Sequence, residues 1–262
     1  MDVSTLFNVK DKVVLVTGGS RGIGLMIAQG FVANGARVYI SSRKAAVCDG
    51  VAAELNKQGP GRCFSIPADL QKLDDVKHLV AELSKREKEL HVLVNNAGAN
   101  WAAPIGQYPD EAFQALMSLN VNRVFTLTQG LLPLLEAAAS DASPASVINI
   151  GSIDGLRTPP HETYAYAASK AALHQLTRVM AGQFGHKRIT VNAVAPGPFA
   201  SKMMEETLKN SMDVILATCP LERIGQPTDM AGVCLFLASK AGSFVNGAIL
   251  PVDGGIIVKA RI

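Results

Sequence analysis

A tyrosine and a lysine four residues apart are the strongest candidates for chemistry in this sequence of 262 residues. Tyr166 and Lys170 belong to the segment YAASK, and a helix brings residues at this spacing onto one face. A nearby ammonium group stabilises phenolate and lowers the pKa of a tyrosine below its usual value near 10. Such a phenol can give a proton to a developing alkoxide or remove one from an alcohol. Tyr164 is excluded from this role because its fourth neighbour is Ala168.

A serine upstream of this pair supports a catalytic interpretation over a core tyrosine that merely lies beside a lysine. Ser152 ends an apolar run and comes 14 residues before Tyr166. Its hydroxyl could bond the same substrate oxygen that the phenol would protonate. The three residues together predict a site that acts on a carbonyl or an alcohol.

A glycine-rich turn, TGGSRGIG, follows the first apolar run and directly precedes a helical pattern. Glycine accepts positive φ angles and lets the backbone approach a diphosphate, and a helix N-terminus offers free N–H donors. Gly18, Gly22 and Gly24 are spaced more widely than in the usual GxGxxG pattern. Glycine turns also serve merely as connections, but a place between a strand and a helix favours dinucleotide binding.

The residues after the second apolar run favour NADPH over NADH. An NAD site usually has an acidic side chain there to bond the ribose 2′-hydroxyl. This chain has Ser41, Ser42 and Arg43 instead, and Arg21 lies in the glycine turn. A 2′-phosphate carries about two negative charges and needs cations and hydrogen-bond donors. We therefore predict NADPH, although each arginine alone would be interpreted as a surface charge.

Seven short apolar runs alternate with longer helical patterns along the chain. The runs span 13–18, 36–42, 62–69, 91–98, 146–152, 189–197 and 247–255, and the helical patterns lie near 22–33, 44–58, 72–88, 109–138, 164–185 and 227–239. Strands that are apolar along their whole length are covered on both faces. Strand–helix alternation implies right-handed crossovers. We predict an α/β, single-domain Rossmann fold over 1–262, with a seven-stranded parallel doubly wound sheet and helices on both faces.

The composition excludes several kinds of partner. Aromatic residues make up 5% and the net charge is +3, so neither a stacking surface nor a basic surface for nucleic acid is expected. No stretch reaches the roughly 18–20 apolar residues of a membrane span. The four cysteines are far apart and lack the spacing of a zinc site. We expect buried thiols, no metal, and a cytoplasmic protein in a reducing compartment.

Several sequence blocks together resemble the short-chain dehydrogenase/reductase family, especially its NADPH-linked β-ketoacyl and carbonyl reductases. The blocks are TGGSRGIGLMIAQG, VNNAG, YAASKAALHQLTR and PVDGG, and the resemblance covers nearly the whole chain. It implies hydride transfer to the carbonyl of a ketone or β-ketoacyl substrate, with Tyr166 as the proton donor. Ser152 would polarise the oxygen, Lys170 would also bond the nicotinamide ribose, and Asn120 would anchor a water relay. Asn122 is the weaker asparagine because it faces elsewhere on the helix.

The resemblance also implies which residues bind the cofactor, all of them at strand ends that share one edge of the sheet. Asn95, beside them, is expected chiefly to tie strands together. Asp69 has two interpretations, an adenine contact or the N-cap of the next helix. The expected cofactor-binding residues are Gly18, Ser20, Arg21, Gly22, Ile23, Gly24, Ser42, Arg43, Asp69, Leu70, Asn96, Ala97, Gly98, Tyr166, Lys170, Pro196, Gly197 and Ser201.

The sequence departs from the family pattern at two places. The interval from Ser152 to Tyr166 is one residue longer than the commonest one, and the intervening loop holds RTPPH. This loop should border the substrate, with His161 expected to be exposed rather than in contact with it. Ser201 stands where the family usually has threonine, and either hydroxyl can bond the nicotinamide carboxamide.

The segment at about 199–219 is expected to form a lid over the substrate. Its apolar side chains could equally be core, but methionines adapt to irregular ligands and favour a moderately apolar ketone or β-ketoacyl substrate. The residues that would supply this apolar side are Phe199, Met203, Met204, Leu208 and Met212, together with Trp101.

Two alternatives remain open at the level of sequence. One is an enzyme of the same fold that oxidises an alcohol, a steroid or a sugar. The other is an NADPH-binding sensor without chemistry, which the complete set of catalytic residues disfavours. The resemblance also implies a homodimer or homotetramer that packs the helices near 109–138 and 164–185, where alanines at 137–139 and 171–172 would allow close approach.

Overall fold

The computed structural model describes residues 2–260 and contains the seven expected strands in one parallel sheet. Their order, β3-β2-β1-β4-β5-β6-β7, reverses direction at β1, as in a doubly wound sheet. The strands are β1 (Val13–Thr17), β2 (Arg37–Ser41), β3 (Arg62–Ser65), β4 (Val92–Asn95), β5 (Ala145–Ile150), β6 (Ile189–Pro196) and β7 (Ile249–Val252). The predicted fold class is confirmed.

The helices follow the predicted pattern, with two additional helices, α1 and α8, and one interruption. The helices are α1 (Val3–Leu6), α2 (Gly22–Ala33), α3 (Ala45–Leu55), α4 (Leu73–Arg86), α5 (Asp110–Met117), α6 (Arg123–Ala138), α7 (Tyr164–Phe184), α8 (Glu205–Thr218) and α9 (Pro227–Ala238). The helix expected over 109–138 is interrupted by a π-helical turn at Ser118–Asn122. No helix among residues 2–260 is long and apolar enough to cross a membrane.

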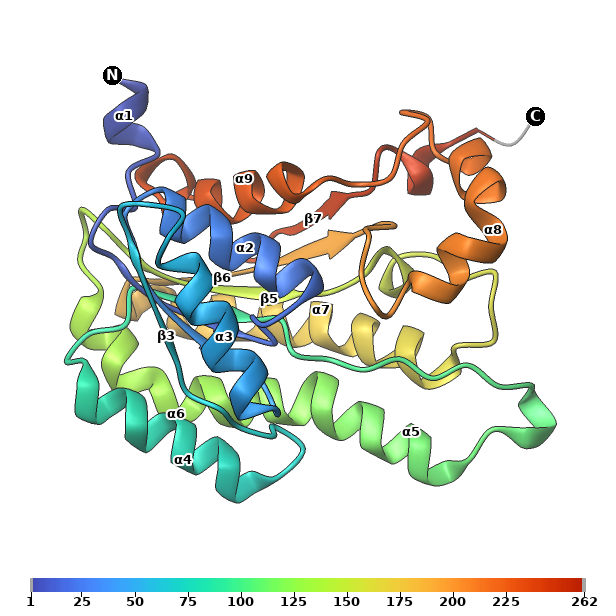
Figure 1. Cartoon of the computed structure of the whole chain (residues 1–262), viewed down its shortest axis with the longest axis horizontal. Helices are drawn as coiled ribbons and strands as arrows, with labels where there is room; N and C mark the ends of the chain where they lie inside the picture. The colour runs from blue at the N-terminus through green and yellow to red at the C-terminus, as the bar shows by residue number, and fades with distance from the viewer. Residues whose placement is uncertain (1, 261–262) are drawn as a thin grey trace.

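Alternate strand residues build two cores, one on each face of the sheet. In β1, Val14 and Val16 pack with α2, α3 and α9, whereas Val13 and Leu15 pack with α4, α6 and α7. Figure 1 shows α2 and α9 above the sheet and α4 and α6 below it. Burial on both faces explains why the strands read as unbroken apolar runs.

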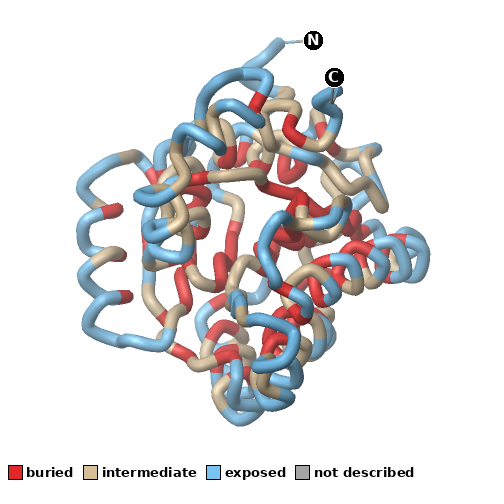
Figure 2. The backbone as a smooth tube through the Cα atoms, turned by 90° about the vertical axis from the view of Figure 1, so that its right-hand side faces the viewer, coloured by how far each residue is buried: buried red, intermediate tan, exposed pale blue. Residues whose placement is uncertain are grey.

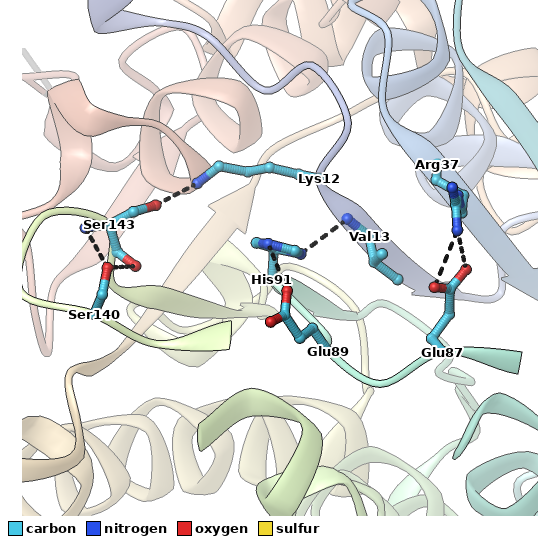
Figure 3. A network of polar contacts seen from close by, with 8 residues as sticks. All are labelled: Lys12, Val13, Arg37, Glu87, Glu89, His91, Ser140 and Ser143. Carbon is cyan, nitrogen blue, oxygen red and sulfur yellow. Dashed lines mark hydrogen bonds and ion pairs between the residues drawn. The ribbon is translucent and has the colours of Figure 1, made fainter. Parts of the chain in front are cut away.

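The two ends of the strands differ in polarity and in what their polar groups contact. At the amino ends, polar residues bond one another or the backbone (Figure 3): His91 Nδ1 accepts from Val13 N at 3.1 Å, and Arg37 pairs with Glu87 at 3.0 Å. Lys12 Nζ donates to Ala238 O at 2.8 Å. The hydrogen-bonding and charged groups at the amino ends are thus paired within the protein. This edge of the sheet therefore supports the fold and is not a candidate ligand site.

The carboxyl ends carry the loops that hold the motifs. The register pairs Thr17 with Ser41 and Asn95 with Asn149, so neighbouring strands end at the same level. The kinked helix α8 lies at this end, to the right in Figure 1, beside the tip of β6. Figure 2 views the molecule from that side, where exposed segments surround a buried centre.

Candidate active site

Ser152, Tyr166 and Lys170 meet where β5 ends and α7 begins. Lys170 Nζ lies 5.6 Å from the centroid of the Tyr166 ring and donates a hydrogen bond to Ile150 O at 2.8 Å. The Ser152 side chain lies close enough to the Tyr166 phenol to favour the phenolate and so to oppose a rise in the phenol pKa. Because β5 ends in the residue before Gly151-Ser152, the strand itself delivers the serine to α7.

The expected lowering of the Tyr166 pKa is wrong for the chain by itself. Burial raises the pKa of Tyr166 to about 12, and the Asp154 carboxylate raises it further, against the opposing effect of Ser152. The Lys170 ammonium bonds the Ile150 carbonyl instead of the phenol. The spacing in the sequence fixes the shared helix face but not the group that the lysine contacts.

Burial also affects the lysine. Lys170 is buried, and desolvation lowers its pKa to about 8. An amine with that pKa exchanges protons readily near neutral pH, as a residue that resupplies a proton donor must do.

Asn120 lies in the π-helical turn, not within a continuous α-helix as expected. Its side chain is buried. Asn120 Oδ1 accepts from Ala99 N at 3.0 Å, and Asn120 Nδ2 donates to Ala99 O and to Ser169 Oγ, both at 3.0 Å. A π turn widens the backbone hydrogen-bond pattern and is frequently found at functional sites. Asn122 is exposed, as predicted.

The glycine turn has the shape that a diphosphate requires. Gly18 and Gly22 have φ values of +66° and +52°, which side chains of L-residues rarely adopt. A Cβ on Gly24 would lie 2.3 Å from Gly18 O, so the turn can fold tightly against the helix only with glycine there. The N-terminus of α2 begins at Gly22 and directs its free N–H groups to this turn.

The end of β2 has unpaired polar groups suited to a 2′-phosphate. Among the described residues, the hydroxyl oxygens of Ser41 and Ser42 are buried without an oxygen or nitrogen partner. The Arg43 side chain is exposed next to Ser42 in the chain, and the Arg21 side chain is exposed in the glycine turn. Neither arginine forms an ion pair within residues 2–260. The residues present therefore fit a phosphorylated dinucleotide such as NADPH.

The loop after β4 connects the cofactor turn to the catalytic residues. Asn95 donates to Asn149 Oδ1 at 2.9 Å and so ties β4 to β5, as predicted. Asn96 Nδ2 donates to Thr17 O at 2.8 Å and so holds the start of the glycine turn. The same Asn96 side chain was expected to lie near the cofactor ribose. A Cβ on Gly98 would lie 3.6 Å from Lys170 Nζ, so this loop passes directly over the lysine.

Asp69 is not a helix N-cap, so that one of its two interpretations is wrong. The N-cap of α4 is Lys72, and Asp69 Oδ1 instead accepts from Gln71 N at 3.1 Å. Its backbone N–H donates to Asp75 Oδ2 at 2.8 Å. Leu70, next to it, is buried.

The segment after β6 brings Ser201 to the glycine turn. A Cβ on Gly22 would lie 3.2 Å from the Ser201 Cβ, and one on Gly197 would lie 2.8 Å from the Asp253 Cβ. Phe199 was expected on the lid but is core: it is 2% exposed and packs on Gly225. A single parallel β-bridge also joins the backbones of Phe199 and Gly225.

Two open depressions flank the site. The larger, of about 620 Å³, is lined by Ala200, Ser201, Lys202, Glu205, Leu208, Lys209 and Met212. The smaller, of about 360 Å³, is lined by Asn100, Ala102, Ala103, Pro104, His161, Glu162, Thr163 and Thr207. His161 is exposed, as predicted, while Trp101 and Met203 are about half exposed at 48% and 50%.

Sequence reasoning missed three charged or polar groups at the site. Asp154 and Arg157 form an ion pair at 3.4 Å in the loop after Ser152. His174 is buried one helical turn beyond Lys170, and neither ring nitrogen has a partner among the described residues. The longer interval between Ser152 and Tyr166 was the sequence feature that could have drawn attention to the Asp154–Arg157 pair. The i, i+4 spacing of Lys170 and His174 could have predicted that His174 lies on the same face of the helix as the lysine.

The remaining titratable groups do not form another site. The four cysteines are buried free thiols. Among the described residues there is no group of three or more histidine, cysteine or acidic side chains arranged to hold a metal ion. Tyr164 is partly exposed, and its hydroxyl donates to Glu162 Oε1 at 2.6 Å, away from the lysine.

Known proteins resemble this chain over nearly its whole length. A sequence model described as enoyl-(acyl carrier protein) reductase matches residues 18–257. The chain is 43% identical over 251 residues to the rhamnolipids biosynthesis 3-oxoacyl-[acyl-carrier-protein] reductase of Pseudomonas aeruginosa, covering 95% of this chain and 97% of that protein. It is 35% identical over 264 residues to a galactitol 2-dehydrogenase of Cereibacter sphaeroides, covering 98% and 100%.

A solved structure supports the same relationship. The Pseudomonas aeruginosa RhlG/NADP active-site complex superposes with a TM-score of 0.92 at 42% sequence identity, covering 96% of this chain and 98% of that one. The resemblance inferred from the four sequence blocks is thereby confirmed. The chain belongs to the short-chain dehydrogenase/reductase family.

Proposed function

We propose that this protein is an NADPH-dependent reductase that converts the ketone of a 3-oxoacyl thioester, or a similar apolar ketone, into an alcohol. The observation that carries the proposal is the meeting of Ser152, Tyr166 and Lys170 beside the glycine turn. The 43% identical relative is a 3-oxoacyl reductase, which supports the substrate class. The substrate is a small molecule or a small group on a carrier.

Each catalytic residue has a defined role in this proposal. Bound NADPH supplies the hydride. Ser152 and Tyr166 donate hydrogen bonds to the carbonyl oxygen, and preset donors of this kind stabilise the charge that develops on it. Tyr166 then releases its proton to that oxygen. Lys170 resupplies the proton and bonds the cofactor ribose, and Asn120 anchors the water that connects the lysine to solvent.

The cofactor preference follows from the end of β2. Ser42 and Arg43, with Arg21 from the glycine turn, would hold the 2′-phosphate through hydrogen bonds and charge. The pyrophosphate would lie on the turn from Gly18 to Gly24, and Asn96 to Gly98 would border the adjoining ribose. Pro196, Gly197 and Ser201 would contact the nicotinamide. The relative's structure with NADP supports this choice.

We infer that α8 and the residues before it form the substrate lid. Helix α8 has no buried residue and is kinked at Ser211, so little of it is fixed by the core. Leu208 and Met212 line the larger depression and would contact an acyl chain. The lid begins after Phe199, because that residue is part of the core.

Two features support a homodimer or homotetramer in a reducing cytoplasm. Phe113, Phe125 and Val179 on α5, α6 and α7 are exposed by 39%, 42% and 50%, which a contact between copies would cover. The four free thiols suit a reducing compartment. The mass of the particle in solution, measured by light scattering, tests the assembly.

An oxidative dehydrogenase is the second candidate, and the galactitol dehydrogenase relative favours keeping it. That reaction uses the same residues in reverse, since Tyr166 as phenolate would accept the alcohol proton. A non-catalytic NADPH sensor is disfavoured because the catalytic set is complete.

The test is a substrate panel followed by the absorbance of NADPH. The panel contains 3-oxoacyl thioesters, simple ketones, a 2-enoyl thioester, and sugar alcohols or steroids with NADP, each repeated with NADH or NAD. We expect the highest kcat/KM with a 3-oxoacyl thioester and NADPH. Faster turnover of the enoyl thioester or of an alcohol would overturn the proposal, and so would equal use of NADH.

A further inference from the structure

The loop between β5 and α7 places an acidic group against the catalytic turn of α7. Asp154 lies two residues after Ser152, in a short 3-10 turn formed by Ile153–Gly155. A Cβ on Gly155 would lie 2.7 Å from the Lys170 carbonyl carbon and 2.8 Å from Ala171 N, so the turn is packed directly on α7. The position of the acid relative to Tyr166 and Lys170 is therefore fixed by backbone contact.

The same acid also contacts the catalytic serine. Asp154 N donates to Ser152 Oγ at 3.1 Å, so the serine hydroxyl is the N-cap of the turn that carries the carboxylate. The carboxylate itself is largely buried, with 24% of its side chain exposed. Charges in such surroundings interact more strongly than charges at the surface.

The counterion of this carboxylate is incomplete. Arg157 Nε lies 3.4 Å from Asp154 Oδ1, and both atoms are buried without a hydrogen-bond partner among the described residues. A well-formed pair would be shorter and bidentate. The carboxylate is therefore only partly neutralised by its arginine, and its charge still acts on its neighbours.

Five charged or titratable groups surround the Tyr166 phenol and its loop. Lys170, on the same helix, bonds Ile150 O. Asp154 acts on the phenol directly, and Arg157 and His161 act on Asp154 from the loop. His174 faces Lys170 from the next helical turn. Asp154 is the one among them that opposes loss of the phenol proton.

We propose that Asp154 is a positioning residue that keeps Tyr166 in the phenol form, and that Arg157 sets how strongly it does so. The inference rests on the proposed function. Reduction requires the phenol as proton donor, whereas oxidation requires the phenolate as base. A carboxylate close to the phenol therefore raises the pH at which the reduction loses its proton donor and at which the oxidation gains its base.

The test compares pH profiles of kcat/KM in both directions for Asp154→Asn and Arg157→Gln. Asparagine keeps the backbone N–H that donates to Ser152 Oγ and removes only the charge. We expect Asp154→Asn to move both profiles by about one unit toward lower pH, since phenolate then forms more easily. Arg157→Gln should move them toward higher pH, because the carboxylate then acts at full strength.

Asp141→Asn is the matched control. It also removes a carboxylate from an arginine pair, with Arg188, but an exposed one far from the catalytic residues in the loop before β5. We expect its profiles to match those of the unaltered protein. The binding of NADPH by each variant, followed by fluorescence, and its unfolding temperature show that it is folded.

Unmoved profiles in a folded Asp154→Asn variant would overturn the inference, as would shifts of the same sign for the two variants. Either result leaves the proposed function standing if the unaltered protein reduces the ketone. A chain that reduces no ketone at any pH would instead overturn the proposed function.

Discussion

Arg43 and Ser42 follow β2 directly, and at the scale of single residues we propose that they decide which cofactor is bound. An oxygen-rich 2′-phosphate can use hydroxyl groups that lack a partner and guanidinium groups that lack a carboxylate. Both kinds of group are present within the described residues 2–260. A 2′-hydroxyl would instead need an acidic acceptor, and the end of β2 offers none.

Arg43→Ala should weaken NADPH binding by about tenfold and leave NADH binding nearly unchanged, because one charged hydrogen bond to the phosphate is lost. Arg21→Ala should act in the same direction. Fluorescence titration with both cofactors measures the two dissociation constants. Lys44→Ala, beside Arg43 and also exposed, is the control. Equal weakening of NADH and NADPH by Arg43→Ala would contradict the assignment.

The position of a site residue could be predicted from the sequence where a local motif fixes it. The partner of a site residue could not be predicted where contacts between distant segments determine it. The i, i+4 spacing of Tyr166 and Lys170 required a shared helix face. The partner of Lys170, a carbonyl of the adjacent strand, has no signal in local sequence. The sequence left open whether Phe199 lies on the lid or in the core, because apolar residues of both kinds look alike in sequence. Its contact with Gly225, which places it in the core, lies outside its own segment of the chain.

Helix α7 is the element on which the site depends most. It carries Tyr166, Lys170 and His174 at successive steps of four residues, and it packs on the loop that holds Ser152. A Cβ on Gly151 would lie 2.1 Å from His174 Nε2, so glycine at this position makes room for the imidazole. The histidine is thus enclosed between the helix and the catalytic loop.

The enclosure of His174 predicts that stability depends on pH. Burial lowers the pKa of His174 from 6.5 to about 4, with a further contribution from Lys170. The unfolded chain binds this proton more readily, so stability is highest above pH 6.5 and falls toward pH 4. Between pH 7.5 and 5 the loss from this group is about 2 kcal/mol.

Urea unfolding of the unaltered protein and of His174→Gln at both pH values measures this effect. The glutamine cannot titrate, so the variant should lose about 2 kcal/mol less over this interval. His91, whose pKa is also lowered by burial, contributes equally to both proteins and cancels. An equal pH dependence of the two proteins would show that the imidazole is not held neutral.

Elements were predictable where periodicity is strong. All seven strands and the main helices follow the sequence pattern, because strands buried on both faces must be apolar throughout. The π turn at Ser118–Asn122 was missed since one extra residue in a helix leaves no mark on its composition. No helix was predicted in the lid segment at about 199–219, and this segment contains helix α8, which buries no residue.

The order of the strands assembles the site from distant parts of the whole molecule. Gly22 and Ser201 are neighbours in space although 179 residues separate them in the chain, and Gly98 lies over Lys170. A dinucleotide bound at the carboxyl edge would contact most of these segments at once. Its binding should therefore stabilise the fold as a unit.

Saturation with NADPH should raise the unfolding temperature. At a concentration of about 100 times the dissociation constant, the expected gain is about 2.7 kcal/mol, or roughly 5–10 °C for a chain of this size. Differential scanning calorimetry with and without NADPH measures it. Gly24→Ala, whose Cβ would strike Gly18 O, should abolish the rise. A full rise in that variant would contradict the placement of the diphosphate.

The central claim is that the Tyr166 phenol delivers the proton, and Tyr166→Phe tests it most directly. Single-turnover reduction of a 3-oxoacyl thioester by NADPH should slow by at least about a thousandfold in this variant, because general acid catalysis is lost. The dissociation constant of NADPH should change by less than about threefold, since the ring and Lys170 remain. Turnover within tenfold of the unaltered protein, with NADPH still bound, would contradict the account.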